Sequence, residues 1–320
     1  RTTTVQMQTD DFLYLNTRAK ILSFTQESSI TEILANQTIP DSASILHNLS
    51  LPDLPPIALK ILQLSVNSDY SAKELADIVS KDQVMQQQIM LYTQARLTLD
   101  KLDVLGFDKL SHIALGVAAS RAFAYTEGGD TVEFWRHAFY AAAYAERITQ
   151  LVAEPLGLDP ALSYLAGLFH NFGLLLFSQL FQPEYRLLQR WIKLNPKVSV
   201  AVLEKKLLGM GRAFNIIPGG HSQLGEWLLR HWRMPEVVCV VAKEHHSLTY
   251  TGEYAAYVKI IQLTNQLLRE DGIGDGSQGG INEQLLAPLG LTAQKVKDSV
   301  KNIKSGSISF EQMALSLTKK

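Results

Sequence analysis

His170 and Asn171 are the residues of this chain with the clearest chemical potential, because they lie side by side within an apolar segment, Ala161–Phe177. A buried polar group without a partner is costly, so the pair must either be satisfied by specific neighbours or coordinate something. Imidazole is a natural ligand of borderline metals such as zinc, copper and nickel. Four other histidines could complete such a site: His137, His221, His245 and His246.

The same histidines allow a purely structural interpretation. His137 could line the core and bond a backbone carbonyl, and His221 could simply stand at the start of a helix. His170 and Asn171 could form a polar plug that hydrogen-bonds the surrounding helices. Metal ligation and a structural role both stay open at the level of the sequence.

The doublet His245-His246 needs separate treatment. Adjacent residues of one helix cannot both face the same point. We therefore expect His245 to point inward and His246 to be exposed. The remaining histidines match no ligand pattern and are expected in the core or at the surface: His47, His112 and His231.

Helices must position these side chains, since helix signals dominate the sequence and strand signals are scarce. Apolar segments without interior proline predict helices at 134–152, 161–181, 224–232, 237–244 and 255–269. Ser29–Glu32 and Ser71–Glu74 fit the capping box of a helix start, and Pro55 and Pro56 can begin a helix. Breaks are predicted at 127–130, 154–160, 215–220 and 271–280, and the third of them delivers His221 to the start of its helix.

Composition excludes several classes of protein. The 30 basic and 31 acidic residues balance, so there is no electrostatic footprint for nucleic acid or for an anionic membrane. Apolar residues make up 46% of the chain without an uninterrupted run long enough to span a bilayer. The single Cys239 lies in an apolar run and is expected to be a small buried hydrophobe, which fits a reducing, cytoplasmic setting.

Five blocks of the sequence, in order over about residues 45–270, resemble the HDOD family, a regulatory branch of the HD superfamily of metal-dependent phosphohydrolases. The blocks are Leu51–Ile57 (LPDLPPI), Phe134–His137 (FWRH), Ala166–Gly173 (AGLFHNFG), His221–Pro235 (HSQLGEWLLRHWRMP) and Glu244–His246 (EHH). In the superfamily, a first His, a His-Asp doublet on a core helix and a later Asp bind one or two metal ions. The resemblance implies an all-α fold of two packed helical bundles, the C-terminal one HD-domain-like.

The departures from the enzyme pattern bear on function. Asn171 stands where the enzymes have the Asp of the doublet, and Leu174 where they have Lys. Thr264-Asn265 aligns best with the late Ala-Asp. Asparagine carries no charge and presents a donor where an ion would sit, so two-metal phosphoester hydrolysis is not expected. One divalent transition-metal ion on His137, His170, His221 and His245 is the cofactor the sequence still allows.

We expect four regions: an appended helical segment at 1–45, an N-terminal helical lobe at 46–127, an HD-like bundle at 131–270, and a glycine-rich loop with a helical extension at 271–320. By resemblance, the chain is expected to be a bacterial signal-transduction module without catalytic residues, acting as an output, adaptor or ligand-sensing part. Its expected partners are a signalling protein and a small nucleotide, with no nucleic acid and no membrane. The alternatives are a metal-dependent phosphohydrolase of a nucleotide or cyclic dinucleotide, and a plain helical scaffold.

Overall fold

The computed structural model describes residues 51–66, 72–93, 107–123, 129–209, 219–274, 280–304 and 310–318. Every regular element within these ranges is a helix, which confirms the all-α prediction. The predicted segment 1–45 and the capping box Ser29–Glu32 lie outside the described residues, as do Ser71 and His47.

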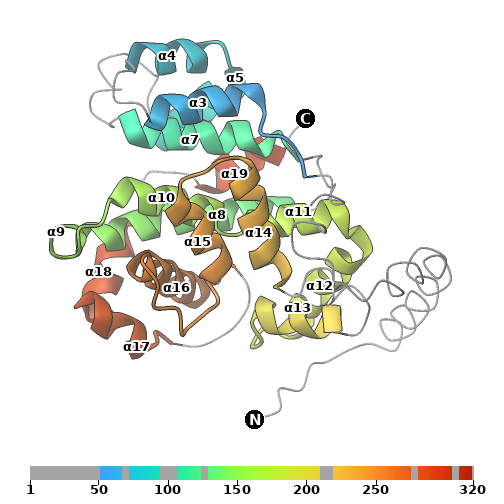
Figure 1. Cartoon of the computed structure of the whole chain (residues 1–320), viewed down its shortest axis with the longest axis vertical. Helices are drawn as coiled ribbons and strands as arrows, with labels where there is room; N and C mark the ends of the chain where they lie inside the picture. The colour runs from blue at the N-terminus through green and yellow to red at the C-terminus, as the bar shows by residue number, and fades with distance from the viewer. Residues whose placement is uncertain are drawn as a thin grey trace, which may run out of the picture.

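Four of the described helices form an N-terminal layer, drawn in blue to teal at the top of Figure 1. They are α3 (Pro56–Val66), α4 (Ala72–Ser80), α5 (Gln83–Thr93) and α7 (Phe107–Ser120). Helix α3 begins at the predicted proline, where the Leu59 amide donates to the Pro55 carbonyl at 3.0 Å. Helix α7 packs against α3 and α5 and also contacts α10 (Pro160–Phe169) of the second bundle, so it joins the two layers.

The larger bundle is built around α8 (Gly129–Gln150) and α10 (Pro160–Phe169), which are in close contact. The other helices of this bundle are α9 (Ala153–Leu156), α11 (Phe172–Leu180), α12 (Gln182–Leu194), α13 (Val200–Gly209), α14 (Gly220–His231), α15 (Glu236–Glu244) and α16 (Ala255–Glu270). Gly167 of α10 makes the central contact possible, because a Cβ there would lie 2.6 Å from the Ala141 carbonyl oxygen of α8. The first histidine and the core histidine are therefore carried by the two most tightly packed helices.

The predicted helix over 161–181 is wrong in one respect, because it is two helices with a break at His170 and Asn171. His170 ends α10, and Asn171 precedes α11 with φ −102° and ψ 9°. No proline marks this break. Gly173, in the first turn of α11, lies against the backbone of α14 and leaves no space for a Cβ. The break places the His170 ring at a helix end, facing the other histidines.

The described C-terminal helices are α17 (Glu283–Leu286), the 3-10 turn η2 (Ala287–Leu289), α18 (Ala293–Lys304) and α19 (Phe310–Thr318). Among them, α18 and α19 pack against α8, and α17 packs against α16. Helix α19 lies between the two layers in Figure 1 and contacts both α5 and α8. Gln88 of α5 donates to the Met313 carbonyl at 2.8 Å, and the Phe310 and Tyr140 rings lie 4.7 Å apart.

One stretch among the described residues, Pro160–Leu180, has the length and apolar composition of a membrane-crossing helix, and 78% of its apolar 18-residue window is buried inside the protein. It consists of α10 and α11, the helices that carry His170 in the core.

Candidate metal centre

His221 is fixed by a carboxylate from another helix. Its Nδ1 donates to Oε2 of Glu204 at 2.7 Å, and its backbone amide donates to Oε1 of the same side chain at 2.8 Å. Glu204 belongs to α13 and is only 3% exposed. His221 is the second residue of α14, as the sequence predicted, so the carboxylate also satisfies one of the free amides of that helix start.

His170 and His245 are oriented by one shared device. Each follows the last residue of a helix, α10 or α15, and each Nδ1 lies close to the carbonyl oxygen three residues earlier. The distances are 2.7 Å from His170 to Gly167 and 2.8 Å from His245 to Ala242. A carbonyl oxygen can only accept, so Nδ1 carries the proton in both rings and Nε2 presents a lone pair.

The Nε2 atoms of these rings converge. Nε2 of His221 lies 3.3 Å from Nε2 of His245 and 3.2 Å from Nε2 of His246. The ligand atoms of these three residues all lie within 4.8 Å of one another. The His170 ring meets that of His245 edge-on at 5.0 Å between centroids, which places it beside the three.

The expectation that His246 is exposed is wrong, since its ring is half-buried within the cluster. The helical argument fails because α15 ends at Glu244, so the two histidines occupy the turn after the helix. Their rings lie 4.1 Å apart between centroids and both approach His221.

His137 and Asn265 complete the cluster on the side of His170. Nε2 of His137 and Nδ2 of Asn265 each lie 3.3 Å from Nε2 of His170. Among the described residues, Nδ1 of His137 and Oδ1 of Asn265 are buried without a hydrogen-bond partner. Asn171 is half-buried at the start of α11, and its side chain makes no capping hydrogen bond there.

Burial favours the neutral form of four imidazoles of the cluster, those of His137, His170, His245 and His246. Loss of solvent lowers the pKa of His137 to about 3, helped by the neighbouring His170, and lowers the pKa of His170 to about 4. Burial also holds the pKa values of His245 and His246 well below the ordinary value, and the adjacent rings act in the same direction. Neutral imidazole is the form that binds a metal.

The donor set fits a transition-metal ion. Nδ1 of His221 and Nδ1 of His245 each face an oxygen outside the cluster, so their Nε2 atoms, 3.3 Å apart, are the nitrogens that can bind a metal ion. Metal-ligating histidines in proteins usually bind the ion with one ring nitrogen and donate the other N–H to a carboxylate or a backbone carbonyl, and His221 and His245 have this arrangement. His221, His245 and His246 would hold the ion, with His170 beside them.

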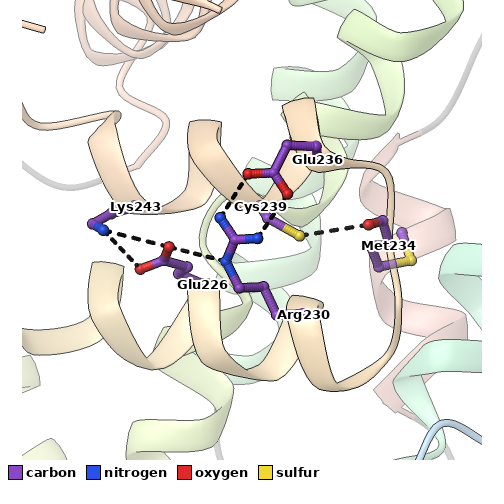
Figure 2. A network of polar contacts seen from close by, with 6 residues as sticks. All are labelled: Glu226, Arg230, Met234, Glu236, Cys239 and Lys243. Atoms are coloured by element: carbon purple, nitrogen blue, oxygen red, sulfur yellow. Dashed lines mark hydrogen bonds and ion pairs between the residues drawn. The ribbon is translucent and has the colours of Figure 1, made fainter. Parts of the chain in front are cut away.

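His221 lies at the start of α14, and His245 and His246 follow the end of α15, so all three lie at the open end of the hairpin that these two helices form. A polar network ties the two helices together, as Figure 2 shows. Arg230 donates to both carboxylate oxygens of Glu236 at 2.7 Å, and Glu226 lies between Arg230 and Lys243 at 3.1 and 3.2 Å. Glu226 is buried, whereas Arg230, Glu236 and Lys243 are exposed, so the network joins the two helices at the edge of the core.

Cys239 faces the interior of this hairpin and donates to the Met234 carbonyl at 3.6 Å (Figure 2). It is 1% exposed, and burial raises the pKa of its thiol to about 12. The prediction of a small buried hydrophobe is confirmed.

Comparison with known proteins assigns part of the chain to a family. Residues 98–248 match the family model of the HDOD domain. This part of the chain is an HDOD domain. The matched segment contains all five clustered histidines and Glu204, whereas Asn265 follows it. The resemblance drawn from the sequence blocks is therefore confirmed.

Solved structures support the same fold. A crystal structure of a candidate signal transduction protein from Marinobacter aquaeolei VT8 is 27% identical with a TM-score of 0.71, and the match covers 85% of this chain and 60% of that one. An HDOD domain protein of unknown function from Geobacter sulfurreducens is 21% identical with a TM-score of 0.62, covering 88% of this chain and 99% of that one.

A candidate phosphohydrolase from Shewanella amazonensis SB2B is 20% identical with a TM-score of 0.65, covering 87% and 99% of the two chains. A curated relative, an uncharacterized protein of Treponema pallidum (strain Nichols), is 24% identical over 247 residues. That match covers 74% of this chain and 46% of the relative, so the chain spans about half the length of the relative.

Sequence reasoning missed Glu204. It lies 17 residues before His221 on a different helix, and it matches no block of the HDOD pattern. The one available signal was indirect: a carboxylate at an inward-facing position of α13, a helix whose neighbours Leu203 and Leu207 are buried.

Proposed function

We propose that this chain is a non-catalytic HDOD module of a bacterial signalling pathway, and that its histidine cluster binds one divalent transition-metal ion as part of a ligand-sensing site. The observation that carries the proposal is the donor set. Imidazole nitrogens converge on one point, and the position expected to hold the late aspartate holds Asn265, whose Nδ2 lies 3.3 Å from His170.

Charge explains why this set favours one ion and no hydrolysis. A two-metal hydrolase needs a carboxylate between its ions, both to hold them together and to offset their charge. Asn171 and Asn265 offer neutral amides instead, while Glu204 is bound to Nδ1 of His221, on the far side of that ring from Nε2. A single ion on neutral imidazoles supplies a Lewis-acidic centre, to which an anionic ligand such as a phosphate ester can coordinate.

The signalling context is supported by the protein from Marinobacter aquaeolei, which is described as a candidate signal transduction protein. A second function is favoured by the convergence of five histidines. In that alternative the chain is a phosphohydrolase of a nucleotide or cyclic dinucleotide, the class suggested for the Shewanella amazonensis protein.

Restoring the two carboxylates tests the proposal. We expect Asn171→Asp with Asn265→Asp to raise manganese affinity at least about tenfold, because harder cations require anionic oxygen ligands. Affinity is measured by calorimetric titration of chelator-stripped protein.

The wild-type protein is assayed in parallel against a chromogenic phosphodiester with zinc and with manganese. We expect no turnover above that of the His170→Ala variant. Wild-type turnover that disappears in His170→Ala would refute the non-catalytic proposal and establish the phosphohydrolase.

A further inference from the structure

We propose that Glu204 is the positioning residue of the histidine cluster: it orients His221 and supplies the negative charge that the amides at Asn171 and Asn265 no longer provide. This inference rests on the proposed metal binding and names the residue that makes a neutral ligand set able to hold a divalent ion.

The contact between Glu204 and His221 is made at two points. Oε2 accepts from Nδ1 at 2.7 Å, and Oε1 accepts from the backbone amide of the same residue at 2.8 Å. Two contacts from one carboxylate fix both the backbone position and the ring of His221. A helix cap alone would need only the bond to the backbone amide. The second bond joins the carboxylate to the imidazole that meets two other rings.

The negative charge of Glu204 acts on the proposed metal site through the imidazole ring of His221. The side chain is 3% exposed, and within the described ranges its ion-pair partner is His221. A carboxylate that accepts from Nδ1 makes Nε2 a stronger donor, and it offsets part of the charge of an ion bound on the other side. Glu204 thus provides one negative charge on the Nδ1 side of His221, away from the proposed ion. Neither Asn171 nor Asn265 provides a negative charge next to the ion.

Gly220 makes room for this arrangement. It has a φ of +59°, which favours glycine, and a Cβ there would overlap Oε2 of Glu204. Helix α13 contacts α14 at this point, so the carboxylate reaches His221 from a neighbouring helix rather than from the same one. The backbone at the start of α14 is therefore shaped around the Glu204 carboxylate.

Glu204→Gln tests the charge with little change of shape. The amide oxygen of Gln can still accept from Nδ1, but the negative charge is lost. Chelator-stripped protein is titrated with zinc in a calorimeter, and cobalt is titrated in the same way because its visible absorption reports ligand number and geometry. The matched control is Glu226→Gln, which alters another buried glutamate, 8% exposed and paired with Arg230 and Lys243 in Figure 2.

We expect Glu204→Gln to weaken zinc binding by about 10- to 100-fold and to change the cobalt spectrum, while Glu226→Gln stays within about threefold of wild type. If Glu204→Gln does not fold, Glu204→Asp withdraws the carboxylate by one methylene and should weaken zinc binding at least tenfold. Wild-type affinity in the folded Glu204 variant would overturn the role of Glu204 and leave metal binding intact. Absence of zinc binding in the wild-type protein would overturn both proposals.

Discussion

Gly173→Ala is expected to destabilise the protein by about 3 kcal/mol or more, the upper range for overpacking a closed interface. A Cβ at this position would overlap the carbonyl oxygen of His221 and come within 2.6 Å of the Gly225 backbone nitrogen. Both are backbone atoms, so no side-chain rotation can relieve the overlap. Helix α14 would have to move away from α11 and take His221 with it.

Gly225→Ala is the matched control, because it adds the same methyl group to the facing helix. Its Cβ would meet the Gly173 nitrogen at 3.3 Å and the Ala242 Cβ at 3.6 Å, which small shifts can accommodate. Urea denaturation of both variants measures the difference, and we expect Gly225→Ala to lie within about 1 kcal/mol of wild type. Equal stability of the two variants would show that the α11–α14 contact is not as close as described.

Metal-free protein is expected to lose stability steeply as the pH falls below about 6.5. His112 illustrates the reason: it is buried, stacked against Tyr164, and burial together with Lys109 lowers its pKa to about 4. Between the ordinary pKa near 6.5 and the folded value, the unfolded chain binds a proton that the folded chain does not. Stability is therefore full above 6.5 and falls as the pH approaches 4.

Across this pH window, each buried neutral histidine lowers the free energy of unfolding by up to about 1.4 kcal/mol for each unit by which the pH falls. The clustered histidines act in the same direction as His112, since burial lowers the pKa of His137 to about 3 and of His170 to about 4. Denaturant midpoints of chelator-stripped protein, measured from pH 7 to pH 4.5, give the slope. His112→Leu removes one titrating group outside the cluster. It should therefore reduce the slope of stability against pH by about the contribution of one histidine. An unchanged slope would mean that His112 is charged in the folded protein.

The chemistry-bearing residues could be predicted because they stand in recognisable blocks. The sequence predicts His137, His170, His221 and His245 as possible metal ligands. The structure brings all four together, and their binding of a metal stays a prediction. The all-α fold followed from apolar periodicity and the scarcity of strand signals, and the start of α3 at Pro56 followed from proline chemistry.

Three features could not be derived in this way, each for a physical reason. The break between α10 and α11 has no proline, and the contact of Gly173 with α14 beside it is a tertiary contact that the local sequence does not report. The inward position of His246 depends on the exact end of α15, and helix ends are the least predictable part of a helix. Glu204 acts from a helix that none of the histidine blocks includes, so only the packing of α13 on α14 reveals it.

The central claim is that the histidine cluster holds one metal ion, and metal content is its most direct test. The protein is purified without chelator and without nickel resin, and its metals are counted by elemental mass spectrometry beside His221→Ala. The account predicts about one transition-metal ion per chain in the wild-type protein and far less in the variant. Metal well below one per chain in the wild type, or equal metal in both proteins, would contradict it.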